Sequence, residues 1–227
     1  MDEKTRFSYI HYLMTLPYIT SIDLEDIISP KRIELKDFVK EINNTISPLG
    51  LELRSIVSDY NNIEYYGICQ IFEDPNCKES LGIKPEVIKI YYRFLDAVVE
   101  GSKEGQSRIP YGTVVDMAPE GFSQMNAQDG ISQLRDLGYI DIIEDKISIG
   151  PRGLLEFRPK FSQKATEDDE SALPQCMICL EFILAGKKCQ KCKGYMHSKC
   201  LDLYSMSRED FHCPQCQCSD PFEDFGY

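Results

Sequence analysis

Apolar residues along the first part of the chain recur at helical spacing and then at strand-like spacing. The patterns predict helices over residues 5–16 and 24–28. A third predicted helix has the clearest apolar face, formed by Leu35, Phe38, Val39, Ile42 and Ile46. The pattern then changes, and residues 51–57 and 63–72 predict two strands joined by a turn.

A second stretch with the same order of patterns follows Pro85. Its predicted elements are helices over residues 87–101, 111–117 and 123–137, and strands over residues 139–143 and 147–149. Ser123 is suited to cap the third helix, and Gly138 is suited to end it. Three helices followed by a hairpin is the layout of a winged helix, so two such domains in tandem are expected.

The chain becomes polar after the second unit. Residues 158–173 include an acidic run and almost nothing to bury, which is typical of a linker. A cysteine-rich module follows, and the final segment is acidic and aromatic, either frayed or packed on the module. The expected fold class is α+β, with these parts: winged helix A over 1–84, winged helix B over 85–160, an acidic linker over 161–173, the zinc module over 174–218 and a tail over 219–227.

The cysteines indicate metal binding. Eight of the ten lie after residue 175. No apolar leader precedes the charged start of the chain, and no apolar run reaches the roughly 18 residues that a membrane span requires. We therefore expect a reduced, intracellular protein without a membrane segment, whose clustered cysteines bind metal instead of forming disulfides. Cys69 is expected to be a small buried residue in a strand, and Cys77 a loop thiol.

The net charge of −12 argues against autonomous DNA binding. A helix that reads the major groove needs Arg or Lys for the phosphates. The predicted helix over residues 123–137 offers Arg135 against Asp129 and Asp136. We expect the two winged helices to bind proteins, with direct DNA binding weak or absent.

Four pairs of metal-binding residues carry the chemistry of the chain. Their spacing is Cys176-x2-Cys179-x9-Cys189-x2-Cys192-x4-His197-x2-Cys200-x12-Cys213-x2-Cys216. Thiolate and imidazole at such spacing bind Zn²⁺, with Zn–S bonds of about 2.3 Å, and eight ligands suffice for two closed, structural tetrahedral sites. Two arrangements are possible: neighbouring pairs share an ion, or the first pair joins the third and the second joins the fourth.

The gaps between the pairs resemble those of RING and PHD modules, which are both cross-braced. This resemblance implies one zinc on Cys176, Cys179, His197 and Cys200. It implies a second zinc on Cys189, Cys192, Cys213 and Cys216. The first and last pairs have RING-like sequences, whereas Phe211 stands where a PHD usually has Trp. His212 and Cys218 are expected to be surface residues outside both sites.

In RING ubiquitin ligases, an apolar residue inside the first pair and a proline inside the last help to form the groove for the conjugating enzyme (E2). Ile178 and Pro214 match those positions, although each is also suited merely to shape a zinc loop. A basic residue often follows the last ligand and helps to activate ubiquitin. Gln217 stands there, which predicts weak activity without a partner. No catalytic triad, phosphate loop or carboxylate pair stands out, so no catalytic residue is assigned.

Two winged helices, an acidic linker and a variant RING with seven Cys and one His resemble the Nse-one family, the first non-SMC element of the SMC five–six complex. The resemblance is most specific at Met196-His197-x2-Cys200, at Cys213-Pro-x-Cys216 and at the stretch from Asn43 to Gly50. It implies a nuclear, chromosome-associated protein of DNA repair and recombination. It also implies four partners: a MAGE-type third element, a kleisin fourth element, the SMC five–six core and an E2.

The expected function is that of a RING-type E3 ubiquitin ligase and scaffold. Such a protein holds a charged E2 near a lysine of the complex, so the rate gain comes from proximity and orientation. Two alternatives are kept: a non-catalytic zinc module that braces the subcomplex, and a PHD-like chromatin reader.

Overall fold

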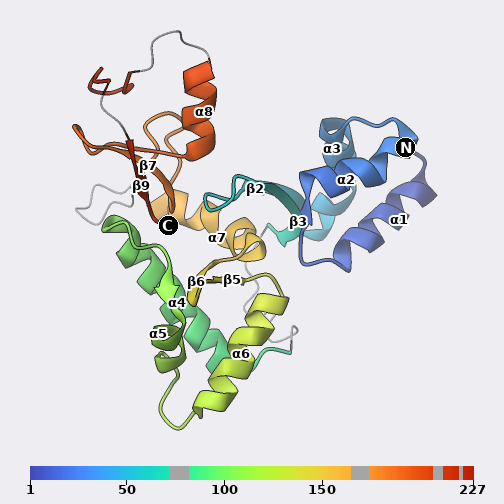
Figure 1. Ribbon diagram of the computed structural model, residues 1–227. Coiled ribbons are helices and arrows are strands. Elements are labelled where there is room, and N and C mark those ends of the chain that lie inside the picture. The colour runs from blue at the N-terminus through green and yellow to red at the C-terminus, as the bar shows by residue number, and fades with distance from the viewer. Residues whose placement is uncertain (72–81, 165–173, 207–211, 220–221) are drawn as a thin grey trace.

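The computed structural model describes residues 1–71, 82–164, 174–206, 212–219 and 222–227. Figure 1 shows three parts around a central helix, α7 (Pro151–Lys164). We call them unit A (up to residue 71), unit B (residues 82–150) and the cysteine module (from residue 174). Helices combined with separate three-stranded sheets confirm the expected mixed α and β class. Within the described ranges, no helix combines the length and the apolar character that crossing a membrane requires.

Unit A packs helices on a small antiparallel sheet. Its elements are α1 (Glu3–Met14), β1 (Ile19–Thr20), α2 (Ser21–Ile28), α3 (Leu35–Ile46), β2 (Leu51–Val57) and β3 (Glu64–Gln70). Single 3-10 turns at Ser29–Lys31 and Ser47–Leu49 follow α2 and α3. The sheet order is β1-β3-β2. The sequence predicts all of these helices and strands except β1, whose two residues pair only with the distant β3.

Helix α3 places its predicted apolar face in the core of unit A, where Phe38 and Ile42 are fully buried. The polar Asn43 on the same helix is bound to strand β2. Its Nδ2 donates to Leu53 O at 3.1 Å, and Leu53 N donates to its Oδ1 at 2.6 Å. One side chain thus satisfies both backbone groups of a buried strand residue and fixes the strand against the helix.

Replacing Asn43 by alanine is expected to lower the free energy of unfolding by about 1–3 kcal/mol, because the N–H and C=O of Leu53 lose their partners. The neighbouring Asn44 is exposed, so Asn44→Ala is the matched control. Urea unfolding of both variants measures the difference. Equal stability of the two variants would show that the amide does not hold β2 in place.

Unit B repeats the order of elements found in unit A. It contains α4 (Pro85–Lys103), β4 (Ile109–Pro110), α5 (Tyr111–Asp116), α6 (Gln124–Asp136), β5 (Ile140–Ile143) and β6 (Lys146–Ile149). Its sheet order, β4-β6-β5, corresponds to that of unit A. Two local predictions are confirmed: the Ser123 side chain accepts from Asn126 N at 3.2 Å and caps α6, and Gly138 takes a φ of 77° after that helix.

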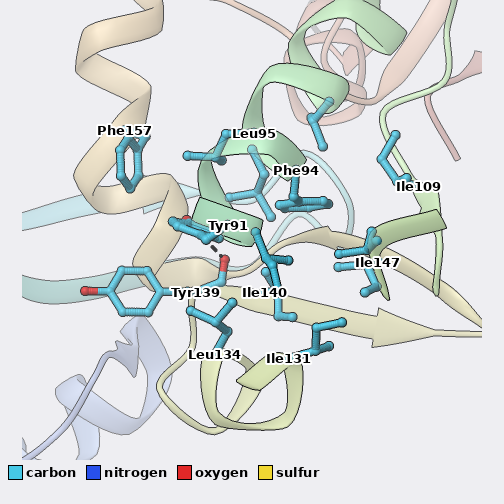
Figure 2. Close-up of a cluster of buried hydrophobic side chains, with 14 of the residues drawn as sticks. Tyr91, Phe94, Leu95, Ile109, Ile131, Leu134, Tyr139, Ile140, Ile147 and Phe157 are labelled. Atoms are coloured by element: carbon cyan, nitrogen blue, oxygen red, sulfur yellow. Dashed lines mark hydrogen bonds between the residues drawn. The ribbon is translucent and has the colours of Figure 1, made fainter. Parts of the chain in front are cut away.

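The core of unit B draws side chains from its helices, its sheet and α7. Figure 2 shows Tyr91, Phe94 and Leu95 of α4 facing Ile140 and Ile147 of the sheet. Phe157 of α7 lies edge-on to Tyr91, with ring centroids 5.7 Å apart. Helix α7 is therefore part of this core.

Helix α7 is longer than the sequence predicts. The pattern predicts one further helical turn at residues 153–157, whereas the helix reaches Lys164 and enters the expected linker. The rest of that linker, residues 165–173, lies outside the described residues, as does Cys77. Tertiary contacts support the helix: α7 packs on β2 and β3 of unit A, and Arg158, just past the predicted turn, donates from Nη1 to Val57 O at 3.1 Å.

The cysteine module is built from short elements. They are β7 (Gly186–Cys189), β8 (Tyr195–Met196), α8 (Ser198–Met206) and β9 (Phe222–Phe225). Strand β7 lies between β8 and β9 and is antiparallel to both. Residues 222–227 of the expected tail are therefore packed on the module. They also reach unit B, where Ser107 Oγ donates to Gly226 O at 2.8 Å.

Candidate metal centre

Three of the four ligand pairs lie in the same kind of loop. In each loop, the residue after the second cysteine donates its backbone N–H to the carbonyl of the first: Leu180 to Cys176 (2.8 Å), Lys193 to Cys189 (2.9 Å) and Gln217 to Cys213 (2.9 Å). All three donors have a positive φ, between 57° and 63°. The chain reverses at these residues, which places both thiols of a pair on the same side of the loop.

The first cluster joins the first and third pairs. Its ligand atoms, all within 4.8 Å of one another, belong to Cys176, Cys179, His197 and Cys200. His197 directly precedes α8, and Cys200 lies in the first turn of that helix. His197 Nδ1 lies 3.3 Å from Cys179 Sγ and 3.8 Å from Cys200 Sγ, so this nitrogen faces the thiols.

The second cluster joins the second and fourth pairs. Its ligand atoms, again within 4.8 Å of one another, belong to Cys189, Cys192, Cys213 and Cys216. The sulfur atoms of Cys189 and Cys216 are 3.8 Å apart, and those of Cys192 and Cys213 are 3.6 Å apart. The structure thus brings together the two sets of the cross-braced arrangement and not those of the sequential one.

The distances and donor types of both clusters suit zinc. Tetrahedral coordination with Zn–S bonds of about 2.3 Å places neighbouring sulfurs about 3.8 Å apart, close to the observed separations. Thiolate and imidazole donors in sets of four are those of structural zinc sites.

Crowding opposes simultaneous ionisation of the thiols in each cluster. Burial and the neighbouring Cys176 and Cys179 raise the pKa of the Cys200 thiol to about 12. Burial likewise raises the pKa of the Cys213 thiol to about 12. Sulfur atoms this close cannot all be negatively charged unless a cation joins them. A divalent ion bound by these residues would supply that charge in place of the thiol protons.

The prediction that Cys218 lies on the surface is wrong. Its side chain is buried, with 8% exposure, and its Sγ lies 3.7 Å from Cys189 Sγ and 3.1 Å from Cys216 Sγ. The left-handed Gln217 turns the chain back, so that Cys213 N donates to Cys218 O at 2.8 Å. The Cys216-x-Cys218 spacing is the sequence feature that could have predicted a fifth sulfur beside the second cluster. His212 is half-buried, and neither cluster includes it among the described residues.

Two charged residues lie beside the first cluster, and no motif or spacing in the sequence predicts them there. Asp59 is expected in a turn and Arg158 at the start of a linker, but both side chains are buried. Arg158 Nη1 donates to Asp59 Oδ1 at 2.9 Å, and Asp59 Oδ1 lies 3.5 Å from His197 Nε2. A charged pair from unit A and α7 therefore lies next to an expected metal ligand.

Ile178 and Pro214 lie on the first and last loops, and both are half-exposed. The neighbouring residues Met177 and Gln215 approach the same glycine: a Cβ at Gly194 would lie 2.1 Å from Met177 Cε and 2.7 Å from Gln215 Oε1. The two loops are therefore adjacent. Gln217 is exposed, and its Nε2 donates to Pro214 O at 3.2 Å.

Two family models match the chain. One, described as the Nse1 non-SMC component of the SMC5-6 complex, matches residues 9–109. The other, described as a RING-like domain, matches residues 176–216, which contain all eight expected ligands.

Curated proteins and a solved structure extend the match over the whole length. The non-structural maintenance of chromosomes element 1 homolog of Drosophila melanogaster is 23% identical over 88% of both chains. The homolog of Homo sapiens is 20% identical over 84% of this chain and 70% of its own. A chain of a solved Nse1-Nse3-Nse4 complex shares the fold with a TM-score of 0.77 and 13% identity, over 100% of this chain and 99% of that one. The chain therefore belongs to the Nse1 family, with a RING-like domain at residues 176–216.

Proposed function

We propose that this protein is a partner-dependent RING-type E3 ubiquitin ligase and a scaffold subunit of the SMC5-6 complex. The observation that carries the ligase proposal is the adjacency of the Ile178 and Pro214 loops beside two four-ligand clusters. Both residues are half-exposed, which suits a shallow apolar groove for an E2. The E2 keeps the catalytic cysteine, and this chain contributes position and orientation.

The proposed metals are two structural zinc ions. Cys176, Cys179, His197 and Cys200 would hold one ion, and Cys189, Cys192, Cys213 and Cys216 the other. Each ion would have four protein ligands, which leaves no position for a reacting water. Bound zinc therefore braces the loops that carry Ile178 and Pro214 and supplies no reaction chemistry.

Units A and B are proposed to be winged helices over residues 1–84 and 85–160. Both show the order helix, strand, helix, helix, strand, strand, and in both the first strand pairs with the third. The remaining parts of the proposed division are the linker over 161–173, the RING over 174–218 and the tail over 219–227. Helix α7, which reaches Lys164, joins the second winged helix to the start of the linker.

The proposed partners are a MAGE-type third element and a kleisin fourth element, together with the SMC5-6 core and an E2. The similar solved structure is titled an Nse1-Nse3-Nse4 complex, which supports the first two. The net charge of −12 favours protein partners over DNA for the winged helices. The proposed setting is the nucleus, on chromosomes, in DNA repair and recombination.

Replacing Ile178 by alanine is expected to abolish most ubiquitin discharge from an E2 while the protein keeps its fold. This side chain is only partly buried, so truncation should remove docking surface more than stability. The assay uses the chain co-purified with a MAGE-type protein, with several E2 enzymes. Leu49→Ala is the control, because Leu49 is an exposed apolar residue of unit A. No discharge by the wild type with any E2 would favour the non-catalytic bracing role. Discharge that Ile178→Ala leaves intact would remove Ile178 from the E2 contact.

Replacing Gln217 by arginine is expected to raise discharge several-fold in the same assay. The position is exposed, and its left-handed backbone strains any non-glycine residue similarly, so the fold should tolerate the change. A cationic side chain after the last ligand can hold the E2–ubiquitin conjugate in its reactive arrangement. Gln217→Glu is the matched control with the opposite charge. Equal rates for both variants would remove Gln217 as the cause of weak activity.

A further inference from the structure

A buried carboxylate of unit A reaches into the cysteine module. Asp59, which follows β2, has a side chain with 2% exposure. Its Oδ2 accepts the backbone N–H of Leu184 at 2.8 Å, and its Oδ1 accepts from Arg158 Nη1 at 2.9 Å. Leu184 belongs to the module and Arg158 to α7, so the carboxylate binds both at once.

Arg158 extends this link in several directions. Its Nη1 also donates to Val57 O at 3.1 Å, and its Nη2 donates to Phe182 O at 2.8 Å. The pair of Asp59 and Arg158 therefore joins unit A, α7 and the loop after the first ligand pair. Burying two charges is costly unless both are paired and hydrogen-bonded, and here both are.

The pair lies at the second ring nitrogen of His197. Because Nδ1 faces the thiols of Cys179 and Cys200, a metal on Nδ1 leaves the proton on Nε2. The acceptors near Nε2 are Phe182 O at 3.2 Å and Asp59 Oδ1 at 3.5 Å. Arg158 Nη2 lies 2.8 Å from Nε2 but is itself a donor, so it must withdraw slightly when Nε2 is protonated.

This arrangement matches the outer shell of a metal site. A ligating histidine usually donates its other N–H to a carboxylate or a carbonyl, which fixes the ring and raises its basicity. Here the Phe182 carbonyl is the nearer acceptor at 3.2 Å, and Asp59 places a carboxylate 3.5 Å from the same nitrogen. Arg158 holds both Asp59 and the Phe182 carbonyl in place. The carboxylate comes from a domain 138 residues before the histidine in the chain.

We propose that Asp59 and Arg158 are positioning residues of the first metal site, so that metal binding there and the docking of unit A on the module stabilise each other. The coupling is reciprocal: the metal favours docking by the same factor by which docking favours the metal. The second cluster has no such contact with Asp59 or Arg158 among the described residues. This inference rests on the proposed zinc sites but not on ligase activity.

Asp59→Asn tests the first direction of the coupling. The full chain is loaded with Co²⁺, whose absorption bands distinguish the first site, with its histidine ligand, from the all-cysteine second site, and chelator is titrated in. We expect the first site to lose metal at about 10- to 100-fold lower chelator than in the wild type, with the second site unchanged. Glu156→Gln is the control, because Glu156 pairs with Arg152 away from both clusters.

Hydrogen exchange tests the reverse direction. The amide of Leu184 donates to Asp59 Oδ2 across the contact and reports docking directly. The amide of Asn62 donates to Ser58 O and reports the order of the turn that carries Asp59. Removing metal from the wild type should speed exchange at both amides, and Asp59→Asn should speed exchange even with metal bound.

Equal weakening of both cobalt sites, or no weakening, would overturn the proposal and leave the pair a plain structural bridge. A wild type that binds no Co²⁺ or Zn²⁺ would overturn the zinc sites as well. Loss of ligase activity alone would not bear on either.

Discussion

Replacing Cys176 by alanine is expected to remove one metal ion and to unfold the cysteine module. The thiol is fully buried at 0% exposure, and it accepts the backbone N–H of His197 at 3.5 Å. It therefore joins two ligand pairs that are distant in the chain. Structural zinc contributes roughly 10–16 kcal/mol of apparent binding free energy in small zinc folds, which exceeds the stability of most domains.

The reason for so large an effect is the small apolar core of the module. The cluster of buried residues around the second site consists of Cys189, Cys213 and Cys218. Phe182 and Leu184 are buried too, but they belong to the core of unit B. The other buried apolar side chains of the described module are few, and they include Ile183, Met196 and Phe225. Little apolar surface remains to hold the module together once an ion is lost.

Metal content by mass spectrometry and thermal unfolding measure the outcome for Cys176→Ala. The variant should retain at most one ion per chain and begin to unfold at a lower temperature than the wild type. His212→Ala is the control, because this half-buried histidine lies outside both clusters yet next to a ligand. Two retained ions in Cys176→Ala would show that Cys176 is not a ligand.

Local pattern predicted most of the regular structure because those elements are held by local forces. The apolar spacing of α3 places Phe38 and Ile42 in the core, and Ser123 caps α6 by its own hydrogen bond. Strands β1 and β4 have two residues each and take all their partners from β3 and β6. No periodicity can reveal elements of that length.

The candidate site also has features that local sequence predicts and features that only the tertiary structure shows. Residue type and spacing predict the eight candidate ligands. Spacing alone leaves two pairings open, and the structure brings together the cross-braced sets that the RING and PHD resemblance implies. Asp59 and Arg158 could not be predicted because they lie 99 residues apart and meet only after unit A docks on α7. Spacing does not reveal that Cys218 is buried, because the left-handed backbone at Gln217 turns the chain so that the Cys218 thiol lies beside Cys189 Sγ.

Replacing Phe182 by alanine is expected to cost about 3–5 kcal/mol of stability, because the variant leaves a cavity in a close-packed core. Phe182 lies in the cysteine module, yet its side chain, with 1% exposure, belongs to the core of unit B. Its carbonyl also accepts from Arg158 at 2.8 Å. The Phe182 ring thus provides the apolar part of the contact by which the module packs on unit B.

Leu180→Ala is the matched control from the same loop, because Leu180 is 72% exposed and should change stability by less than about 0.5 kcal/mol. Urea unfolding, followed separately by tyrosine fluorescence and by metal release, measures both variants. In the wild type the two signals should change together, since one core spans unit B and the module. In Phe182→Ala the module should release metal at lower urea than unit B unfolds. Coincident transitions in that variant would mean that the Asp59–Arg158 pair and strand β9 hold the module without the ring.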